Sequence, residues 1–164
     1  MVNAMRILSL LAVAAASFVA GGFLWDDVLF RMPRYCLAGI EVVDGDTLRC
    51  EWRTIRLAGF DAPESILQNV HCPEEKQLGD VAACTLRQLV AKERVLVRPL
   101  GVRDKSYGRR PLADLIVDGS NVSDTLIAQG LARPYTEGEA KPGWCDLIRS
   151  WPELLERKCP QQTQ

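Results

Sequence analysis

Short apolar runs separated by polar turns dominate residues 37–60. Two such runs, at residues 37–43 and 48–52, are joined by Asp44-Gly45-Asp46-Thr47, and Asp-Gly between apolar runs is a strong hairpin signal. A third strand over residues 53–60 follows directly, and Gly59 near its end favours a bend. The pattern therefore predicts three successive strands, the first two joined by an acidic turn.

From residue 73 onward the spacing of apolar residues becomes helical. Pro73 suits a first helical turn, and Leu78 and Leu89 belong to an apolar series with helical spacing. Two further apolar-rich runs, at residues 94–100 and 112–117, predict a fourth and a fifth strand. The helix is therefore expected to lie between two groups of strands.

The last third of the chain carries two helix-start signals. Asn121 is expected to cap a second helix that runs to Gln129 and is ended by Gly130. Ser150-Trp151-Pro152-Glu153 has the pattern of a capping box and predicts a short terminal helix. The apolar residues of this terminal helix are expected to dock on the domain: Trp151, Leu154 and Leu155. Residues 160–164 are expected to be disordered.

This order of elements indicates a mainly β fold with α-helices, of the α+β class. Five strands and two to three helices in 164 residues favour a small five-stranded Greek-key barrel with helices packed on it. The expected domain organisation is an N-terminal segment at residues 1–30, a barrel domain at 36–136 and a C-terminal extension at 137–164.

The N-terminal segment has the pattern of an export signal. Residues 7–25 contain no charged side chain and follow Arg6. The run is also about long enough to cross a bilayer, which takes about 17–25 residues, so a cleaved signal peptide and an uncleaved membrane anchor both stay open. A buried core helix is the third alternative. Because Arg6 precedes the run and Asp26 and Asp27 follow it, we expect a periplasmic or secreted domain.

Net charge gives no support to nucleic-acid binding. Removing residues 1–30 takes one residue from the 20 Lys and Arg and two from the 21 Asp and Glu, which leaves 19 of each. Local charge is more uneven, because residues 87–110 hold eight basic side chains against two acidic ones. That patch can meet phosphates, and it can equally be a solvated surface.

Cysteine and histidine usage restricts the possible chemistry. Six cysteines in an exported domain predict disulfides, with Cys72 and Cys145 as a candidate pair and Cys50 expected to be a buried thiol. His71 is the only histidine, and no Cys-x-x-Cys pair occurs. These counts argue against a structural zinc site, a Ser-His-Asp triad and a histidine-based nuclease.

Carboxylates and arginines are the remaining candidates for catalysis. Asp46 lies in the first hairpin turn, and Asp61 and Glu64 lie on the loop that leaves the third strand. Oxygen ligands suit a hard cation such as Ca²⁺, and Glu64 is then available as a general base that activates water. Arg56 and Arg109 can bind a phosphate in two-pronged fashion.

The spacing of two of these residues raises a geometric difficulty. Arg56 and Asp61 are five positions apart, and on a regular strand such residues point to opposite faces. A bend at Gly59 would bring both side chains to the same end of the barrel. The hypothesis of a shared site therefore depends on a break in the third strand.

Four motifs in this order resemble the thermonuclease, or staphylococcal nuclease-like, family. They are Val43-Asp44-Gly45-Asp46-Thr47, Arg56-Leu57-Ala58-Gly59-Phe60-Asp61-Ala62-Pro63-Glu64, Tyr107-Gly108-Arg109 and Ala128-Gln129-Gly130-Leu131-Ala132. The resemblance spans roughly residues 37–135. It implies an OB-fold barrel that hydrolyses DNA and RNA with calcium.

The resemblance also implies a role for each matching residue. Calcium ligands are expected at Asp46, Asp61 and the backbone carbonyl of Ala62, and Asp44 is expected to contact these ligands without binding the ion. Glu64 is expected to be the general base. Arg56 and Arg109 are expected to bind the phosphate, and Tyr107 to contact the nucleotide. The family often has threonine at position 62, but a backbone ligand tolerates alanine.

Three functions are compatible with these observations. The first is a calcium-dependent endonuclease acting on single-stranded DNA or RNA outside the cytoplasm, either released or anchored through residues 7–25. The second is a non-catalytic OB-fold module that binds nucleic acid or protein, since fold does not fix function. The third is an anchored structural spacer. The sequence predicts no protein partner.

Overall fold

The computed structural model describes residues 36, 39–51, 53–91, 94–105 and 109–159. The chain divides into two compact units at residues 1–32 and 33–164, and the described residues all lie in the second. The predicted export signal or anchor at residues 1–30 and the expected disorder at 160–164 lie outside the described residues. Among the helices that are described, none is long and apolar enough to span a membrane.

The first three strands form the predicted antiparallel meander. Strand β1 (Ile40–Val42) pairs with β2 (Thr47–Cys50), and β2 pairs with β3 (Arg53–Leu57). Two backbone hydrogen bonds to the carbonyl of Thr47, from Val43 and Asp44, close the Asp-Gly turn. The hairpin prediction is confirmed.

The predicted third strand is broken in two. After β3 the chain passes Gly59, whose φ of +85° lies in the left-handed region, and resumes as β4 (Phe60–Asp61). Strand β4 leaves the main sheet and pairs with β8 (Arg133–Pro134). Glycine adopts this φ at little cost, so the expected bend at Gly59 is confirmed.

The main sheet follows the order β1-β2-β3-β6-β5. Strands β5 (Val95–Arg103) and β6 (Pro111–Val117) are antiparallel, whereas β3 and β6 are parallel. A short strand, β7 (Ser120–Asn121), pairs with β6. This strand order, together with three α-helices, confirms the α+β class and is consistent with an OB-fold-like barrel.

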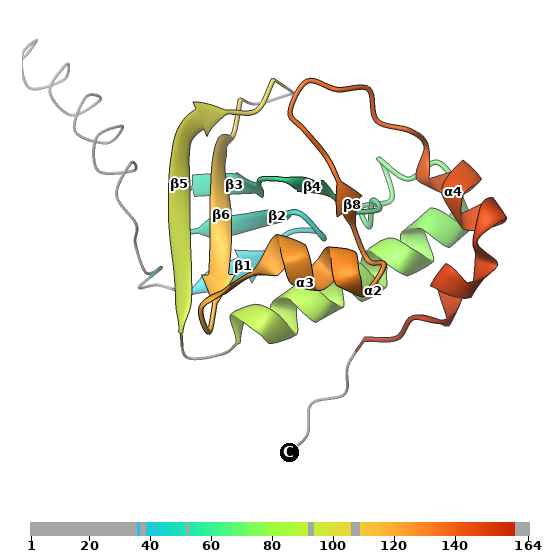
Figure 1. Ribbon diagram of the computed structural model, residues 1–164, viewed down its shortest axis with the longest axis horizontal. Helices are drawn as coiled ribbons and strands as arrows, with labels where there is room; N and C mark the ends of the chain where they lie inside the picture. The colour runs from blue at the N-terminus through green and yellow to red at the C-terminus, as the bar shows by residue number, and fades with distance from the viewer. Residues whose placement is uncertain (1–35, 37–38, 52, 92–93, 106–108, 160–164) are drawn as a thin grey trace, which may run out of the picture. The chain divides into compact units, whose positions relative to one another are not determined.

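Within the described ranges, three α-helices and a short 3₁₀ helix accompany the strands (Figure 1). Helix α2 (Pro73–Val90) begins at the predicted proline, and α3 (Val122–Ala128) is capped by the Asn121 side chain, which accepts a hydrogen bond from the Ser123 N–H at 3.2 Å. Helix α2 packs against α3, α4 (Trp144–Ser150) and the 3₁₀ helix η1 (Pro152–Glu156).

The C-terminal prediction was wrong in two respects. The α-helix, α4, ends at Ser150, which donates its hydroxyl hydrogen bond back to the Asp146 carbonyl instead of capping the next element. The capping-box segment forms only the 3₁₀ helix, which begins at Pro152 and has no side-chain cap. Trp151 does not dock, since 57% of its surface is exposed, whereas Leu154 and Leu155 are partly buried in η1, which packs on α2 and α4.

The core lies between the sheet and helices α2 and α3. Its largest fully buried side chains are apolar, with the single exception of Thr47: Phe60, Leu48, Ile55, Leu57, Leu78, Leu86, Leu115, Leu126, Ile148, Val97, Val122 and Thr47. Each fully buried large aliphatic or aromatic side chain stabilises the fold by about 1.5–3 kcal/mol. This packing fixes the strand ends that carry the polar residues described below.

All six cysteines form disulfides. Cys72 pairs with Cys145, as hypothesised, and Cys84 pairs with Cys159. Cys50 was expected to be a buried thiol, but it bonds to Cys36. The side chain of Cys50 is indeed buried, so its inward position was predicted correctly and its oxidation state was not.

Candidate active site

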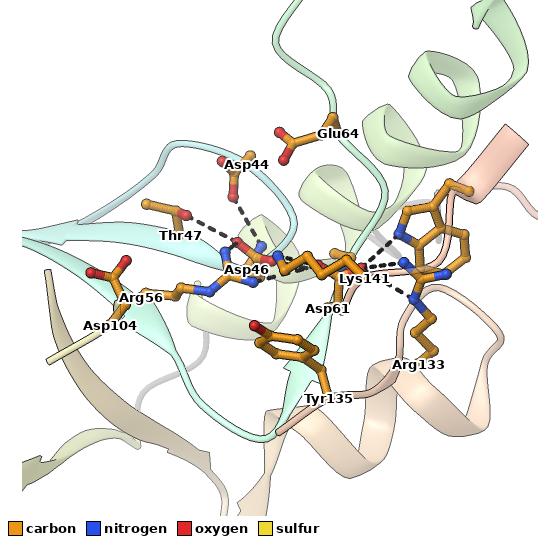
Figure 2. Close-up of polar contacts among 12 residues, drawn as sticks. Asp44, Asp46, Thr47, Arg56, Asp61, Glu64, Asp104, Arg133, Tyr135 and Lys141 are labelled. Atoms are coloured by element: carbon orange, nitrogen blue, oxygen red, sulfur yellow. Dashed lines mark hydrogen bonds and ion pairs between the residues drawn. The ribbon is translucent and has the colours of Figure 1, made fainter. Parts of the chain in front are cut away.

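A buried guanidinium joins two aspartates at the end of the sheet. Arg56 Nη1 donates a 2.7 Å hydrogen bond to Asp46 Oδ1, and Arg56 Nη2 lies 3.5 Å from Asp61 Oδ1. All three side chains are at least nine-tenths buried. The structure therefore brings together three of the residues that the sequence predicted to share a site (Figure 2).

Each of the three is placed by its own strand or turn. Asp46 sits in the β1–β2 turn, and its own backbone carbonyl accepts a hydrogen bond from the Leu57 N–H at 2.8 Å. Arg56 lies in β3 and Asp61 in β4, beyond the break at Gly59. Because the chain turns at that glycine, Arg56 and Asp61 face each other despite their spacing.

Asp61 is the most heavily contacted acid in the site. Its Oδ1 accepts from Lys141 Nζ at 2.5 Å, and its Oδ2 accepts from Arg133 Nη2 at 2.8 Å and from the indole N–H of Trp144 at 3.0 Å. Burial alone would raise the pKa of Asp61, but the hydrogen bonds and charges of Lys141 and Arg133 hold it below its usual range. The carboxylate is ionised at neutral pH.

Asp46 has the opposite balance of influences. Burial is the largest cause and raises the pKa of Asp46 to about 6, and the charges of Asp44 and Asp61 add to this effect. Arg56 and Lys141 act against it. A further cation close to Asp46 would favour its ionised form.

Asp44 and Ala62 surround Asp46 as the resemblance implied. Asp44 is buried, and its Oδ1 accepts a 3.0 Å hydrogen bond from the Asp46 N–H. The Ala62 N–H donates to Asp46 Oδ2 at 3.3 Å. The first contact fixes the backbone of Asp46, and the second fixes its carboxylate. The predicted ligand role of the Ala62 carbonyl stays a prediction.

Glu64 lies at the edge of this cluster and is half-buried (Figure 2). Its Oε2 accepts a long hydrogen bond, 3.5 Å, from the Asn69 side chain. Burial, followed by the charge of Asp46, raises the pKa of Glu64 above its ordinary value. A carboxylate with a raised pKa is a stronger base, which is the property that proton abstraction from water requires.

Glu64 and Asp61 share an open pocket with a second group of polar residues. The pocket has a volume of about 190 Å³. Its walls are formed by these ten residues: Asp61, Ala62, Glu64, His71, Glu75, Arg133, Lys141, Pro142, Gly143 and Trp144. Small molecules and phosphate groups can reach the acidic cluster from this side.

Helix α2 provides a floor of small residues for both site loops. A Cβ at Gly79 would lie 2.4 Å from the Glu64 carbonyl oxygen, and a Cβ at Gly45 would lie 2.7 Å from the Ala62 Cβ and 3.0 Å from the Ala82 Cβ. Such distances leave no room for any side chain. The loops that carry Asp46 and Glu64 therefore rest directly on the helix.

Arg109 does not join the cluster in this structure. Arg109 is exposed with a φ of +45°, and its carbonyl accepts a hydrogen bond from Arg103. Among the described residues, no contact links the Arg109 side chain to the three acids. Tyr107 lies outside the described residues. The roles of both stay predictions.

Sequence reasoning missed the residues that reach the site from distant segments. Arg133, Lys141 and Trp144 come from β8, the segment after it and α4, and no motif marked them. A second group extends from Asp46 in the other direction: Thr47 donates to Asp46 at 3.0 Å, Arg110 to Thr47 at 3.1 Å and Arg110 to Asp104 at 2.8 Å.

The donors of Asp46 and Asp61 fit a hard cation. They are carboxylate oxygens, which Ca²⁺ prefers, and Glu64 lies beside them. A different group of possible metal ligands, Cys72, Glu75 and Cys145, does not fit, because the two sulfurs are joined in a disulfide and offer no thiolate. The acidic cluster is thus the better candidate for a metal.

Comparison with known proteins agrees with this site. Residues 54–148 match the family described as staphylococcal nuclease homologue. No curated protein is significantly similar to the chain. The matched range covers more than half of the chain and contains Arg56, Asp61, Glu64 and Lys141, whereas Asp46 precedes it. The chain belongs to the staphylococcal nuclease family.

Proposed function

We propose that this protein is a calcium-dependent nuclease that hydrolyses phosphodiester bonds of DNA, RNA or both. One observation carries the proposal: Arg56 is buried between Asp46 and Asp61, with Glu64 at the edge of the same cluster. A module that only binds nucleic acid has no need for these acids, because carboxylates repel phosphates unless a cation lies between them.

Arg56 is suited to hold the phosphate. Its Nη2 is buried and has no hydrogen-bond partner among the described residues. The neighbouring acids raise the pKa of the guanidinium above its usual value, although burial acts against them. The unsatisfied N–H groups therefore remain charged donors. A phosphate oxygen would satisfy them and would gain further from the charge that develops during hydrolysis.

Glu64 is suited to accept the proton of the attacking water. Unlike Asp46 and Asp61, Glu64 has no cationic hydrogen-bond partner among the described residues, and its side chain accepts from the neutral Asn69. Asp46 and Asp61 would hold calcium, which supplies positive charge to neutralise the phosphate and to orient water. The three carboxylates thus divide between metal binding and proton transfer.

We place this activity outside the cytoplasm, in the periplasm or in secreted form. Three disulfides among the described residues support this, because such bonds persist in oxidising compartments. The uncharged run at residues 7–25 supports export as well. Membrane anchoring through that run stays part of the proposal.

Cleavage of single-stranded DNA and of RNA by the purified full chain tests the function. We expect cleavage with calcium and none with a chelator. Glu64→Gln removes the carboxylate that acts as general base, and Arg56→Lys removes the guanidinium that binds the phosphate in two-pronged fashion. Each should lower kcat by about 100-fold or more. Glu41→Gln is the matched control, because Glu41 is an exposed carboxylate on β1.

The outcome separates the proposed functions. Cleavage by the unaltered chain that persists in chelator would contradict the calcium requirement. Binding of nucleic acid without any cleavage would replace the nuclease by a binding module. Equal loss in Glu41→Gln and Glu64→Gln would show that the assay reports overall charge instead of the site.

A further inference from the structure

A lysine ammonium contacts the acidic cluster through Asp61. Lys141 Nζ lies 2.5 Å from Asp61 Oδ1, and its charge also acts on the ionisation of Asp46 and Glu64. Figure 2 shows the side chain extending from its own segment toward Asp46 and Asp61. One cation thus faces all three acids that the proposed function assigns to metal and water.

We propose that Lys141 is a built-in competitor of the metal, whose ammonium must leave Asp61 before calcium binds. The inference rests on the proposed function, since it assumes that Asp46 and Asp61 are the metal ligands. It adds that the calcium affinity of the site is set by a residue about 80 positions further along the chain.

Charge balance supports exchange over joint occupancy. The cluster contains four carboxylates, those of Asp44, Asp46, Asp61 and Glu64, and three cations, Arg56, Arg133 and Lys141. A divalent ion together with the two guanidiniums already neutralises four carboxylates. Retaining the ammonium as well would place an excess positive charge beside the ion, and like charges at such distances repel strongly in a partly buried site.

Lys141 is also the cation that can leave most easily. Its side chain is 36% exposed, against 18% for Arg133 and 6% for Arg56. It lies on the irregular segment at residues 135–143, between β8 and α4. A lysine has four rotatable bonds in its stem, so the ammonium can move into solvent while the backbone stays in place.

The segment that carries Lys141 is held by contacts that do not involve the Lys141 side chain. Arg133 donates to the carbonyl of Pro142, and the Gly138 N–H donates to the Tyr135 hydroxyl at 3.2 Å. In the same position the ammonium also lies 4.8 Å from the centre of the Tyr135 ring, a contact that it makes in addition to the one with Asp61. Release from Asp61 therefore does not require the segment to unfold.

Calorimetric titration of the full chain with calcium tests this inference without measuring cleavage. Lys141→Met removes the ammonium and keeps the apolar stem, so we expect it to bind calcium at least about 10-fold more tightly than the unaltered chain. Lys141→Arg retains a cation and is expected to stay close to the unaltered affinity. Lys158→Met, an exposed lysine near the C-terminus, is the matched control for loss of one charge.

A second measurement guards against a simple folding defect. In chelator, Lys141→Met should unfold at a lower temperature than the unaltered chain, because Asp61 has lost its closest counter-charge. Calcium should raise the Tm of this variant more than that of the unaltered chain, since tighter binding stabilises the folded state further.

Each result has a distinct meaning. If the unaltered chain binds calcium and Lys141→Met binds it equally well or more weakly, Lys141 does not compete with the metal. The proposed function is unaffected by that result. Binding by Lys141→Met alone supports the competitor and contradicts calcium dependence of the unaltered chain. Absence of binding by both overturns both proposals.

Discussion

At the scale of single residues, Asp46 gives the folded state a pH dependence of known sign. Its pKa is raised from 3.8 to about 6 in the folded protein, first by burial and then by Asp44 and Asp61. The folded state therefore holds this proton more tightly than the unfolded chain does. The resulting stability is present below the unfolded pKa and is lost as the pH rises through about 6.

Asp46→Asn provides the measurement of this effect. The quantity to follow is the free energy of unfolding of the unaltered chain minus that of the variant, measured in chelator. We expect this difference to decrease as the pH is raised from about 4 to about 6. Chemical unfolding at several pH values reports the difference. A pH-independent difference would mean that Arg56 and Lys141 fully compensate the burial of the carboxylate.

The sequence predicted the residues of the site that lie close together in the chain. Asp44 and Asp46 follow from the hairpin signal, and Arg56 and Asp61 follow from their positions before and after Gly59. Lys141 and Arg133 could not be predicted, because they reach Asp61 from a segment more than 70 positions away. Only tertiary packing brings them there.

At the scale of elements, the contact between helix α2 and the Glu64 loop depends on one missing side chain. Gly79→Ala would improve helix propensity by about 1 kcal/mol. The added Cβ would, however, meet the backbone of Glu64 and Pro63 at 2.4–2.8 Å, and overpacking of this kind costs about 1–3 kcal/mol. We expect a lower Tm, together with lower kcat because Glu64 is displaced.

A neighbouring position on the same helix supplies the control. Asp80→Ala removes only an exposed ion pair with Lys76, which is worth less than about 1 kcal/mol. If Gly79→Ala has the same Tm and kcat as Asp80→Ala, the Glu64 loop can move away from helix α2 without loss of stability or activity.

Elements with strong end signals were predicted well. Helix α2 has Pro73 at its start and acidic residues in its first turn, and α3 has the Asn121 cap. Helix α4 was missed because its N-cap residue is Gly143, which has no side chain that could signal a helix start. Ser150, at the other end of α4, carried the misleading signal.

At the scale of the whole molecule, two disulfides attach the C-terminal segment to helix α2. Cys72–Cys145 closes a loop of 73 residues and Cys84–Cys159 one of 75, whereas Cys36–Cys50 spans only 14. In the chain-entropy account, removing Cys72–Cys145 costs about 4 kcal/mol and removing Cys36–Cys50 about 3 kcal/mol.

Paired alanine variants test this order. We expect Cys72→Ala with Cys145→Ala to lower the free energy of unfolding more than Cys36→Ala with Cys50→Ala does, as measured by chemical unfolding. The reverse order would indicate that the C-terminal segment is held by packing, such as that of buried Trp144 and Ile148, more than by the covalent bond.

The strand pattern predicted the fold class, since alternating runs and turns specify a small barrel. Disulfide pairing was less accessible from sequence. Cys50 was interpreted as a thiol because it lies among inward-facing residues, and a buried half-cystine produces the same pattern. Its partner, Cys36, precedes the first strand and carried no periodic signal.

The arrangement of the disulfides has a consequence for attack by proteases. The segment at residues 135–143 lies between β8 and α4, on the chain between Cys84 and Cys145. If one peptide bond there is cut, the two pieces stay joined by Cys72–Cys145 and Cys84–Cys159. The nicked protein would migrate as one species on a non-reducing gel and as two after reduction, with Lys141 now on a free end beside the acids that it neutralises.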